Sequence, residues 1–221
     1  MIQHDRISQT FIVLASFMFV YLFTIAGSAV VLFPLMLLVL GIVLHRFVQR
    51  KGKDTDDFDD TEIANEHLWK NFLFYTVVAL FGVFMVSEAI NVLPLSMNTG
   101  LTGFYLLLYL ALMGIAEEEF FRGFITDYLL SSLPNRYVAL FLSAGIFMVY
   151  HFAVYGTVFA SLIYVFAGGM ILSWTAYKTR HISPCMAGHV LNNVGAYFAQ
   201  NGSVQASAGI KFIVKVILKV I

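Results

Sequence analysis

The stretch that decides the fold of this chain is residues 101–122, which read LTGFYLLLYLALMGIAEEEFFR. Its first sixteen residues carry no charge, which is typical of a helix that crosses a lipid bilayer. Three consecutive glutamates then follow at the end of the same apolar run. Because an ionisable side chain at membrane depth costs at least a few kcal/mol, such residues usually mark a functional site. The stretch therefore predicts a membrane protein and the region that carries its chemistry.

The composition of the whole chain agrees with a membrane protein. Of its 221 residues, 60% are apolar and 12% are charged, about half the charged share of a soluble domain. Thirteen basic and thirteen acidic residues balance, so the chain has no net charge to attract a nucleic acid. A single cysteine, Cys185, excludes an internal disulfide and a cysteine-rich metal site. A soluble enzyme, a secreted disulfide scaffold and a disordered chain are all poor fits.

We expect an all-α transmembrane bundle of seven or eight spanning helices. The fourth span is expected to continue to Leu130 as one helix of about 30 residues. The final segment, 206–221, places three lysines on one helix face and is either an eighth span or a helix in the interface. The seven apolar stretches of spanning length are 9–25, 28–48, 69–90, 101–121, 137–155, 158–177 and 182–199.

The basic residues predict the orientation of the chain. They follow the second span and flank the later spans. If successive spans alternate in direction, these basic residues all fall on one side of the membrane: Arg46, Arg50, Lys51, Lys53, Lys70, Arg136, Lys178 and Arg180. Cytoplasmic loops are enriched in Lys and Arg, so we expect a multi-pass protein of the plasma membrane with a cytoplasmic N-terminus. The expected parts are an N-terminal hairpin (1–48), an acidic cytoplasmic loop (49–68), a catalytic core (69–200) and a lysine-striped C-terminal helix (201–221).

Glu117, Glu118 and Arg122 form the first candidate cluster. Successive helical residues are rotated by about 100°, so adjacent glutamates face different partners. Glu118 and Arg122 are four apart on one face, where the guanidinium can hold the carboxylate bidentately and leave Glu117 free for chemistry. A structural ion pair that locks this helix to a neighbour is the alternative interpretation.

Residues in two later spans complete the candidate catalytic set. His151 lies in the fifth span, His189 lies in the seventh, and Asn193 follows His189 by one helical turn. Each needs a polar partner in lipid, so we expect them to meet Glu117 around one water-filled cavity at about mid-membrane depth. Candidates for the substrate pocket are Phe121, Phe124, Phe147 and Asn192.

Carboxylate, imidazole and amide groups together suit hydrolysis by activated water. A glutamate assisted by a histidine accepts a proton from water, and the other histidine and the asparagine donate to the developing oxyanion. Glu117, His151 and His189 are also a possible zinc site, although no His-Glu-x-x-His spacing is present and we favour the metal-free version. A third alternative is a thiol nucleophile, because Cys185 and His189 share a helix face.

Three motifs occur in order within apolar segments. They are E-E-x-x-x-R at Glu117–Arg122, F-x-x-x-H at Phe147–His151 and H-x-x-x-N at His189–Asn193. This set resembles the CAAX protease and bacteriocin-processing (CPBP, or Abi) family of intramembrane proteases, to which the CAAX prenyl endopeptidases belong. The resemblance covers about residues 70–200.

The resemblance implies an endopeptidase and a role for each matching residue. Glu117 and His151 would activate water beside Glu118 and Arg122, and His189 with Asn193 would bind the oxyanion. The implied substrate is a prenylated protein or a peptide precursor held at the lipid bilayer, and the balanced charge of the chain already argued against a nucleic-acid partner. Two alternatives remain open, a non-enzymatic scaffold or bacteriocin-immunity protein and a proton-coupled transporter.

Overall fold

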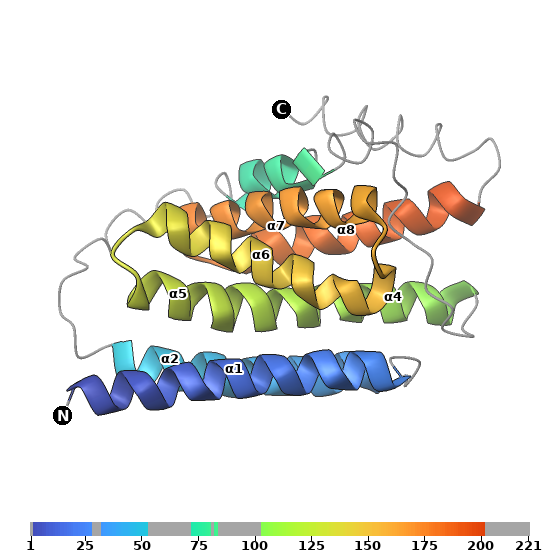
Figure 1. Cartoon of the computed structure of the whole chain (residues 1–221). Coiled ribbons are helices and arrows are strands. Elements are labelled where there is room, and N and C mark those ends of the chain that lie inside the picture. Colours follow the sequence, from blue (N-terminus) through green and yellow to red (C-terminus); the bar gives the residue numbers. More distant parts are fainter. Residues whose placement is uncertain (1, 28–31, 53–71, 81, 84–102, 202–221) are drawn as a thin grey trace.

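The computed structural model describes residues 2–27, 32–52, 72–80, 82–83 and 103–201 (Figure 1). Within these ranges the regular elements are all helices, and no strand is found. A helix satisfies its backbone hydrogen bonds within one segment, which the hydrocarbon of a membrane requires. The expected all-α class is therefore confirmed.

The helices follow one another along the chain much as the apolar stretches predicted, and each expected span inside the described ranges falls on a helix. Residues 72–80 and 82–83 are also helical and belong to the expected third span. The acidic loop beyond Gly52 and the 206–221 segment lie outside the described residues. The other elements are α1 (Ile2–Gly27), α2 (Phe33–Gly52), α4 (Gly103–Glu118), η1 (Glu119–Thr126), α5 (Asp127–Ser132), α6 (Arg136–Tyr155), α7 (Phe159–Thr179) and α8 (Ser183–Asn201).

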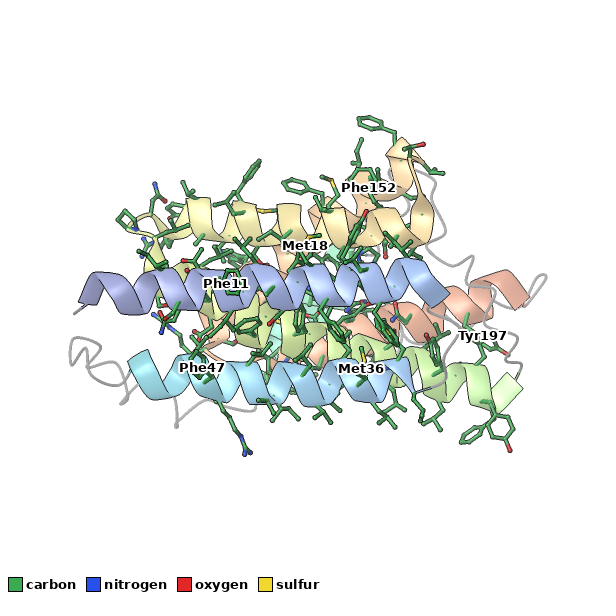
Figure 2. All side chains as sticks on the ribbon, turned by 60° about the horizontal axis from the view of Figure 1, so that its bottom comes forward. Phe11, Met18, Met36, Phe47, Phe152 and Tyr197 are labelled. Atoms are coloured by element: carbon green, nitrogen blue, oxygen red, sulfur yellow. The ribbon has the colours of Figure 1, made fainter. Side chains whose placement is uncertain are left out.

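Three of the described helices contain segments long and apolar enough to cross a membrane: Ile7–Ile25, Arg136–Tyr155 and Phe159–Thr179. The apolar segment Phe33–Val48 of α2 is shorter. Large apolar side chains cover the outward faces of these helices, as Figure 2 shows for Phe11, which is 72% exposed. Such a surface is an aggregation hazard in water but is solvated by lipid chains, so the bundle is a transmembrane one.

The helices are arranged so that the glutamate-bearing helix lies between two groups. In Figure 1, α1 and α2 both run along one face of α4–η1–α5, and α6, α7 and α8 lie on the other side. Residues of α2 contact η1 and α4, α4 packs on α8, and α6 packs on α7. The functional stretch is thus enclosed by helices that come from both ends of the chain.

The helix that contains the glutamates runs without a break from Gly103 to Ser132 through α4, η1 and α5. This confirms the expectation of one long helix of about 30 residues. It ends where Leu133 turns extended, with φ −108° and ψ 135°. Leu133 precedes Pro134, whose ring disfavours the helical conformation of the residue before it.

The start of α6 and the end of α7 meet at one end of the bundle. Arg136 Nη1 donates to the hydroxyl of Tyr177 at 2.8 Å, and the guanidinium of Arg180 lies 5.3 Å from the centre of the same ring. The two helices are joined at the opposite end by a tight turn at Gly156, whose φ of +58° favours glycine. The two arginines therefore lie at the same end of the bundle, in keeping with the one-sided distribution of basic residues.

Candidate active site

The glutamate helix changes its geometry immediately after Glu118. Residues Glu119–Thr126 form a π-helix, whose backbone bonds span five residues instead of four. The hydroxyl of Thr126 donates to the carbonyl of Phe121 at 2.8 Å and lies 2.6 Å from the hydroxyl of Ser143 on α6. Buried hydroxyl groups thus support the wide turn. Short π-helical segments are rare and are often found at functional sites.

Glu118 and Arg122 form a buried ion pair across the start of the π-helix. Arg122 Nη1 donates to Glu118 Oε1 at 3.1 Å, and both side chains are almost fully buried. The pair is not bidentate as expected, because Arg122 Nη2 donates instead to the carbonyl of Gly169 on α7 at 3.2 Å. The guanidinium also lies 4.2 Å from the centre of the Phe147 ring. Arg122 therefore connects the glutamate helix to both α6 and α7.

His189 links the two neighbouring glutamates to α8. Its Nδ1 atom lies 2.7 Å from Glu118 Oε1, and its Nε2 atom lies 3.5 Å from Glu117 Oε2. The first distance is that of a strong, charge-assisted hydrogen bond, whereas the second is at the limit of a direct one. Glu118 thus fixes the orientation of the imidazole ring, and the other ring nitrogen is turned towards Glu117.

His151 is oriented by the backbone of its own helix. Its Nδ1 atom lies 2.9 Å from the carbonyl oxygen of Phe147. A carbonyl only accepts, so Nδ1 carries the proton and Nε2 of the neutral ring is left as an acceptor. The ring packs edge-on against Phe147, with centroids 4.4 Å apart, and stacks on Tyr155 at 5.7 Å. These contacts fix both the tautomer and the plane of the imidazole.

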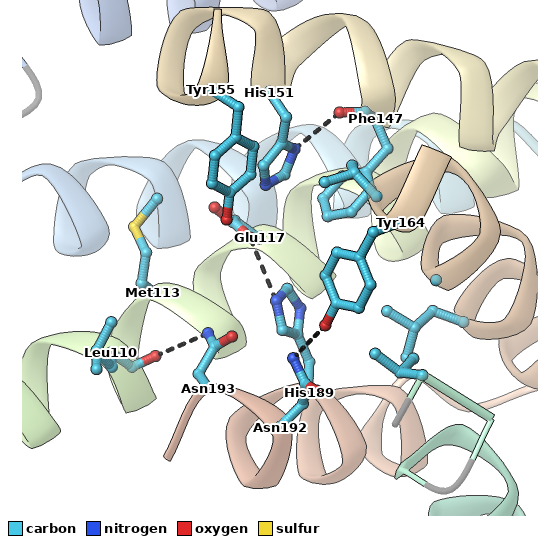
Figure 3. Close-up of a pocket in the computed structure, with 14 residues that line it drawn as sticks. Leu110, Met113, Glu117, Phe147, His151, Tyr155, Tyr164, His189, Asn192 and Asn193 are labelled. Atoms are coloured by element: carbon cyan, nitrogen blue, oxygen red, sulfur yellow. Dashed lines mark hydrogen bonds and ion pairs between the residues drawn. The ribbon is translucent and has the colours of Figure 1, made fainter. Parts of the chain in front are cut away.

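Glu117, His151 and His189 meet at one cavity (Figure 3). The cavity has a volume of about 60 Å³, room for a few water molecules. Asn193 lines it from α8, and its Nδ2 donates to the carbonyl of Leu110 at 3.3 Å. The polar residues are surrounded by apolar and aromatic ones. The cavity is lined by Val83, Leu110, Met113, Glu117, Phe147, His151, Tyr155, Tyr164, Val165, Gly168, Leu172, His189, Asn192 and Asn193.

Comparison with known protein families shows which family this part of the chain resembles. Residues 99–195 match the family described as type II CAAX prenyl endopeptidase Rce1-like. The match contains Glu117, Glu118, Arg122, His151, His189 and Asn193.

Residues 99–195 are thus similar to a CAAX prenyl endopeptidase domain. No curated protein and no solved structure matches the chain. The family is one of intramembrane endopeptidases whose substrates are membrane-associated proteins or peptides. The match therefore supports intramembrane proteolysis as the general activity class.

Two phenylalanines that were expected in the substrate pocket lie outside the cavity. Phe121 and Phe124 are fully buried and do not line the cavity. The ring of Phe121 packs behind it, 4.9 Å from Phe147 and 5.1 Å from Tyr150. The π-helix that begins at Glu119 alters the direction of the following side chains, which a regular helical spacing does not anticipate. The other two expected pocket residues, Phe147 and Asn192, do line the cavity.

The interpretation of Cys185 as a nucleophile is contradicted by its surroundings. Its thiol is fully buried and donates to the carbonyl of Leu172 at 3.2 Å. Cys185 does not line the cavity, and both ring nitrogens of His189 face glutamates. No thiol and imidazole dyad is therefore formed, and Cys185 is a packing residue.

The geometry also bears on the zinc alternative. Among the residues that the structure describes, no three His, Cys, Asp or Glu side chains are grouped so that they could hold a metal ion. Of the three expected ligands, His151 uses Nδ1 for the Phe147 carbonyl and His189 uses Nδ1 for Glu118. These bonds leave Nε2 of both histidines unused by them, and histidines that bind a metal have their other ring nitrogen held in the same way, so the metal-free mechanism stays a prediction.

The third glutamate has a partner outside the family match, which sequence reasoning did not find. Glu119 Oε1 lies 2.8 Å from Nδ1 of His45 on α2. The helices approach closely there, because a Cβ atom on Gly123 would lie 2.8 Å from His45 Nδ1 and one on Gly41 would lie 3.0 Å from the backbone nitrogen of Phe120. Helix α2 of the N-terminal hairpin is thus fitted directly onto the π-helix of the matched region.

Proposed function

We propose that this protein is an intramembrane endopeptidase that hydrolyses a peptide bond by means of a water molecule activated by Glu117 and His151. The observation that carries the proposal is the convergence of Glu117, His151 and His189 at one cavity from three different helices. Ionisable side chains at membrane depth are costly and are retained mainly where they act on a substrate or an ion. The match of residues 99–195 to an endopeptidase family supports the same conclusion.

One side of the cavity supplies proton acceptors. The carboxylate of Glu117 accepts a proton from water, and the unprotonated Nε2 of His151 is a second acceptor, since Nδ1 is held by Phe147. The water oxygen attacks the carbonyl carbon of the substrate as its proton passes to Glu117. Glu117 then returns the proton to the amine that leaves, which completes the hydrolysis.

The other side of the cavity supplies donors to the oxygen that becomes negatively charged. His189 lies between two carboxylates and acts here as an imidazolium, so Nδ1–H donates to Glu118 at 2.7 Å and Nε2–H is a donor on the side of Glu117 and the cavity. One N–H of the Asn193 amide is held by the Leu110 carbonyl, which fixes the side chain and leaves its second N–H. Donors that are fixed before the reaction stabilise the oxyanion at little reorganisation cost.

The substrate that we propose is a lipidated or membrane-embedded chain, either a prenylated protein with a C-terminal CAAX sequence or a peptide precursor. The substrate would enter the cavity from the cytoplasmic side. The protein would lie in the plasma membrane with its N-terminus in the cytoplasm. The basic end of the bundle at Arg136 and Arg180 supports this orientation, since cytoplasmic ends are rich in such residues. We further propose that catalysis needs no metal ion.

The proposal is tested with the purified full-length protein in lipid vesicles and a farnesylated CAAX peptide as substrate. The wild-type protein should release the C-terminal tripeptide, and Glu117→Gln and His151→Ala should each abolish release while the protein still folds. Glu119→Gln is the matched control, because it makes the same change two residues away, outside the cavity, and keeps an oxygen acceptor for His45. It should retain activity.

Full activity of both Glu117→Gln and His151→Ala would overturn the mechanism. The substrate itself is sought by comparing membrane proteomes of cells that carry the wild-type protein or Glu117→Gln. C-terminal fragments should be present only with the wild-type protein. If the two proteomes are the same and the variants differ only in abundance or in bound partners, the protein is a scaffold or an immunity protein.

A further inference from the structure

Tyr164 lines the same cavity from α7 and is not part of any of the three sequence motifs. It lies one turn into the helix and is 5% exposed. Its hydroxyl oxygen accepts a hydrogen bond of 2.8 Å from the amide Nδ2 of Asn192 on α8. A buried phenol held in this way by a neighbouring amide is fixed in position. In Figure 3 its hydroxyl lies on the same side of the cavity as His189.

The hydrogen bond from Asn192 leaves the Tyr164 proton available. The phenol oxygen is the acceptor in that bond, so its own O–H remains a donor. Among the described residues, the hydrogen-bond partner of this hydroxyl is Asn192, which is a donor to it. Because Tyr164 lines the cavity, its remaining donor can be accepted there by a water molecule or by a substrate oxygen.

The two adjacent asparagines have different tasks. Because they are rotated by about 100° about the helix axis, Asn193 reaches Leu110 on α4 whereas Asn192 reaches Tyr164 on α7. One N–H of each amide is therefore already engaged within the protein. The phenol of Tyr164 is a more acidic donor than either amide, and its proton is not used in the hydrogen bond with Asn192.

We propose that Tyr164 is a further catalytic residue, whose hydroxyl donates a hydrogen bond to the carbonyl oxygen of the bond that is cleaved, and that Asn192 is the residue that positions it. This inference rests on the proposed endopeptidase function. As water bonds to the carbonyl carbon, the π electrons of the carbonyl move to its oxygen and the water proton moves to Glu117. Tyr164 keeps its own proton throughout and stabilises the oxyanion together with His189.

The test compares Tyr164→Phe with the wild-type protein in the farnesylated peptide assay. Loss of a single oxyanion donor typically lowers kcat by about 100-fold or more, so Tyr164→Phe should lower kcat by about that factor and change KM little. Asn192→Ala should lower kcat less. In the Tyr164→Phe background, Asn192→Ala should have no further effect on kcat, because Asn192 acts only through the phenol.

Tyr128→Phe is the matched control. It deletes the same atom from another buried tyrosine, whose hydroxyl lies 2.6 Å from Thr10 Oγ1 and does not line the cavity. Its kcat should equal that of the wild-type protein. The inference is overturned if Tyr164→Phe keeps the wild-type kcat, or if its loss of turnover is matched by a loss of folded protein in a thermal melt. A wild-type protein that cleaves nothing would instead overturn the proposed function, and the inference with it.

Discussion

Glu118 and His189 are 71 residues apart in the sequence, and Nδ1 of His189 lies 2.7 Å from Oε1 of Glu118. The same carboxylate oxygen accepts from Arg122 at 3.1 Å. A single atom thus holds the guanidinium on one side and the imidazole that faces Glu117 on the other. We infer that Glu118 and Arg122 position His189 and do not themselves meet the substrate, since neither lines the cavity.

Removal of the guanidinium should destabilise the protein strongly. Arg122→Met leaves the fully buried Glu118 carboxylate without its cation, and breaking a buried pair in this way costs about 3–5 kcal/mol. Arg122→Lys should cost less, because it keeps the charge. Thermal unfolding in detergent measures both changes, with Arg46→Met, on the exposed surface of α2, as the control. Equal melting temperatures for Arg122→Met and Arg46→Met would contradict the structural importance of the pair.

The close fit of α2 against the π-helix predicts that a larger residue at position 123 lowers the stability of the protein. Gly123→Ala would place a Cβ atom 2.8 Å from His45 Nδ1, and such overpacking typically costs about 1–3 kcal/mol. The melting temperature should fall, and it should fall less when the same change is made in a His45→Ala background, where room has been created. Gly145→Ala is the control, because nothing lies within 4 Å of the added atom. Additive effects of Gly123→Ala and His45→Ala would show that the two positions do not meet.

Cys185 should be dispensable for catalysis. Its thiol is buried against the Leu172 carbonyl, so Cys185→Ala should change kcat by no more than about twofold, with a modest loss of stability. Treatment of the folded protein with a membrane-permeant thiol reagent should leave activity intact for the same reason. A folded Cys185→Ala variant without activity would restore the thiol mechanism.

Activity should survive removal of metal ions. The proposed mechanism uses a carboxylate and an imidazole as proton acceptors, and among the described residues no three side chains are grouped to hold an ion. Exhaustive chelation should therefore leave the peptidase rate unchanged, and elemental analysis of the purified protein should give less than one zinc per chain. Loss of activity on chelation, with recovery on addition of zinc, would establish the zinc version instead.

Features that depend on neighbouring residues could be predicted from the sequence. The long helix from Gly103 to Ser132 was expected because an apolar run continues to a break before Pro134. The contact between Glu118 and Arg122 was expected because residues four apart share a helix face. Three spaced motifs also indicated the family, which the match to residues 99–195 bears out.

Other features of the site depend on contacts between distant segments. The pairing of Glu119 with His45, 74 residues away, has no local signal, and neither has the contact of Asn192 with Tyr164. The π-helix was also missed, and with it the burial of Phe121 behind the cavity, because regular helical spacing assumes 3.6 residues per turn throughout.

The sequence by itself determined that this is a helical membrane protein with ionisable residues at membrane depth, because both properties depend only on which side chains are apolar and how they are spaced. Only the tertiary structure decided which of these polar groups line the cavity and which do not. Glu117 and His151 line the cavity, whereas Glu118 and Arg122 lie behind it. The physical reason is that a buried polar group must find a partner, and which partner it finds depends on how separate helices pack.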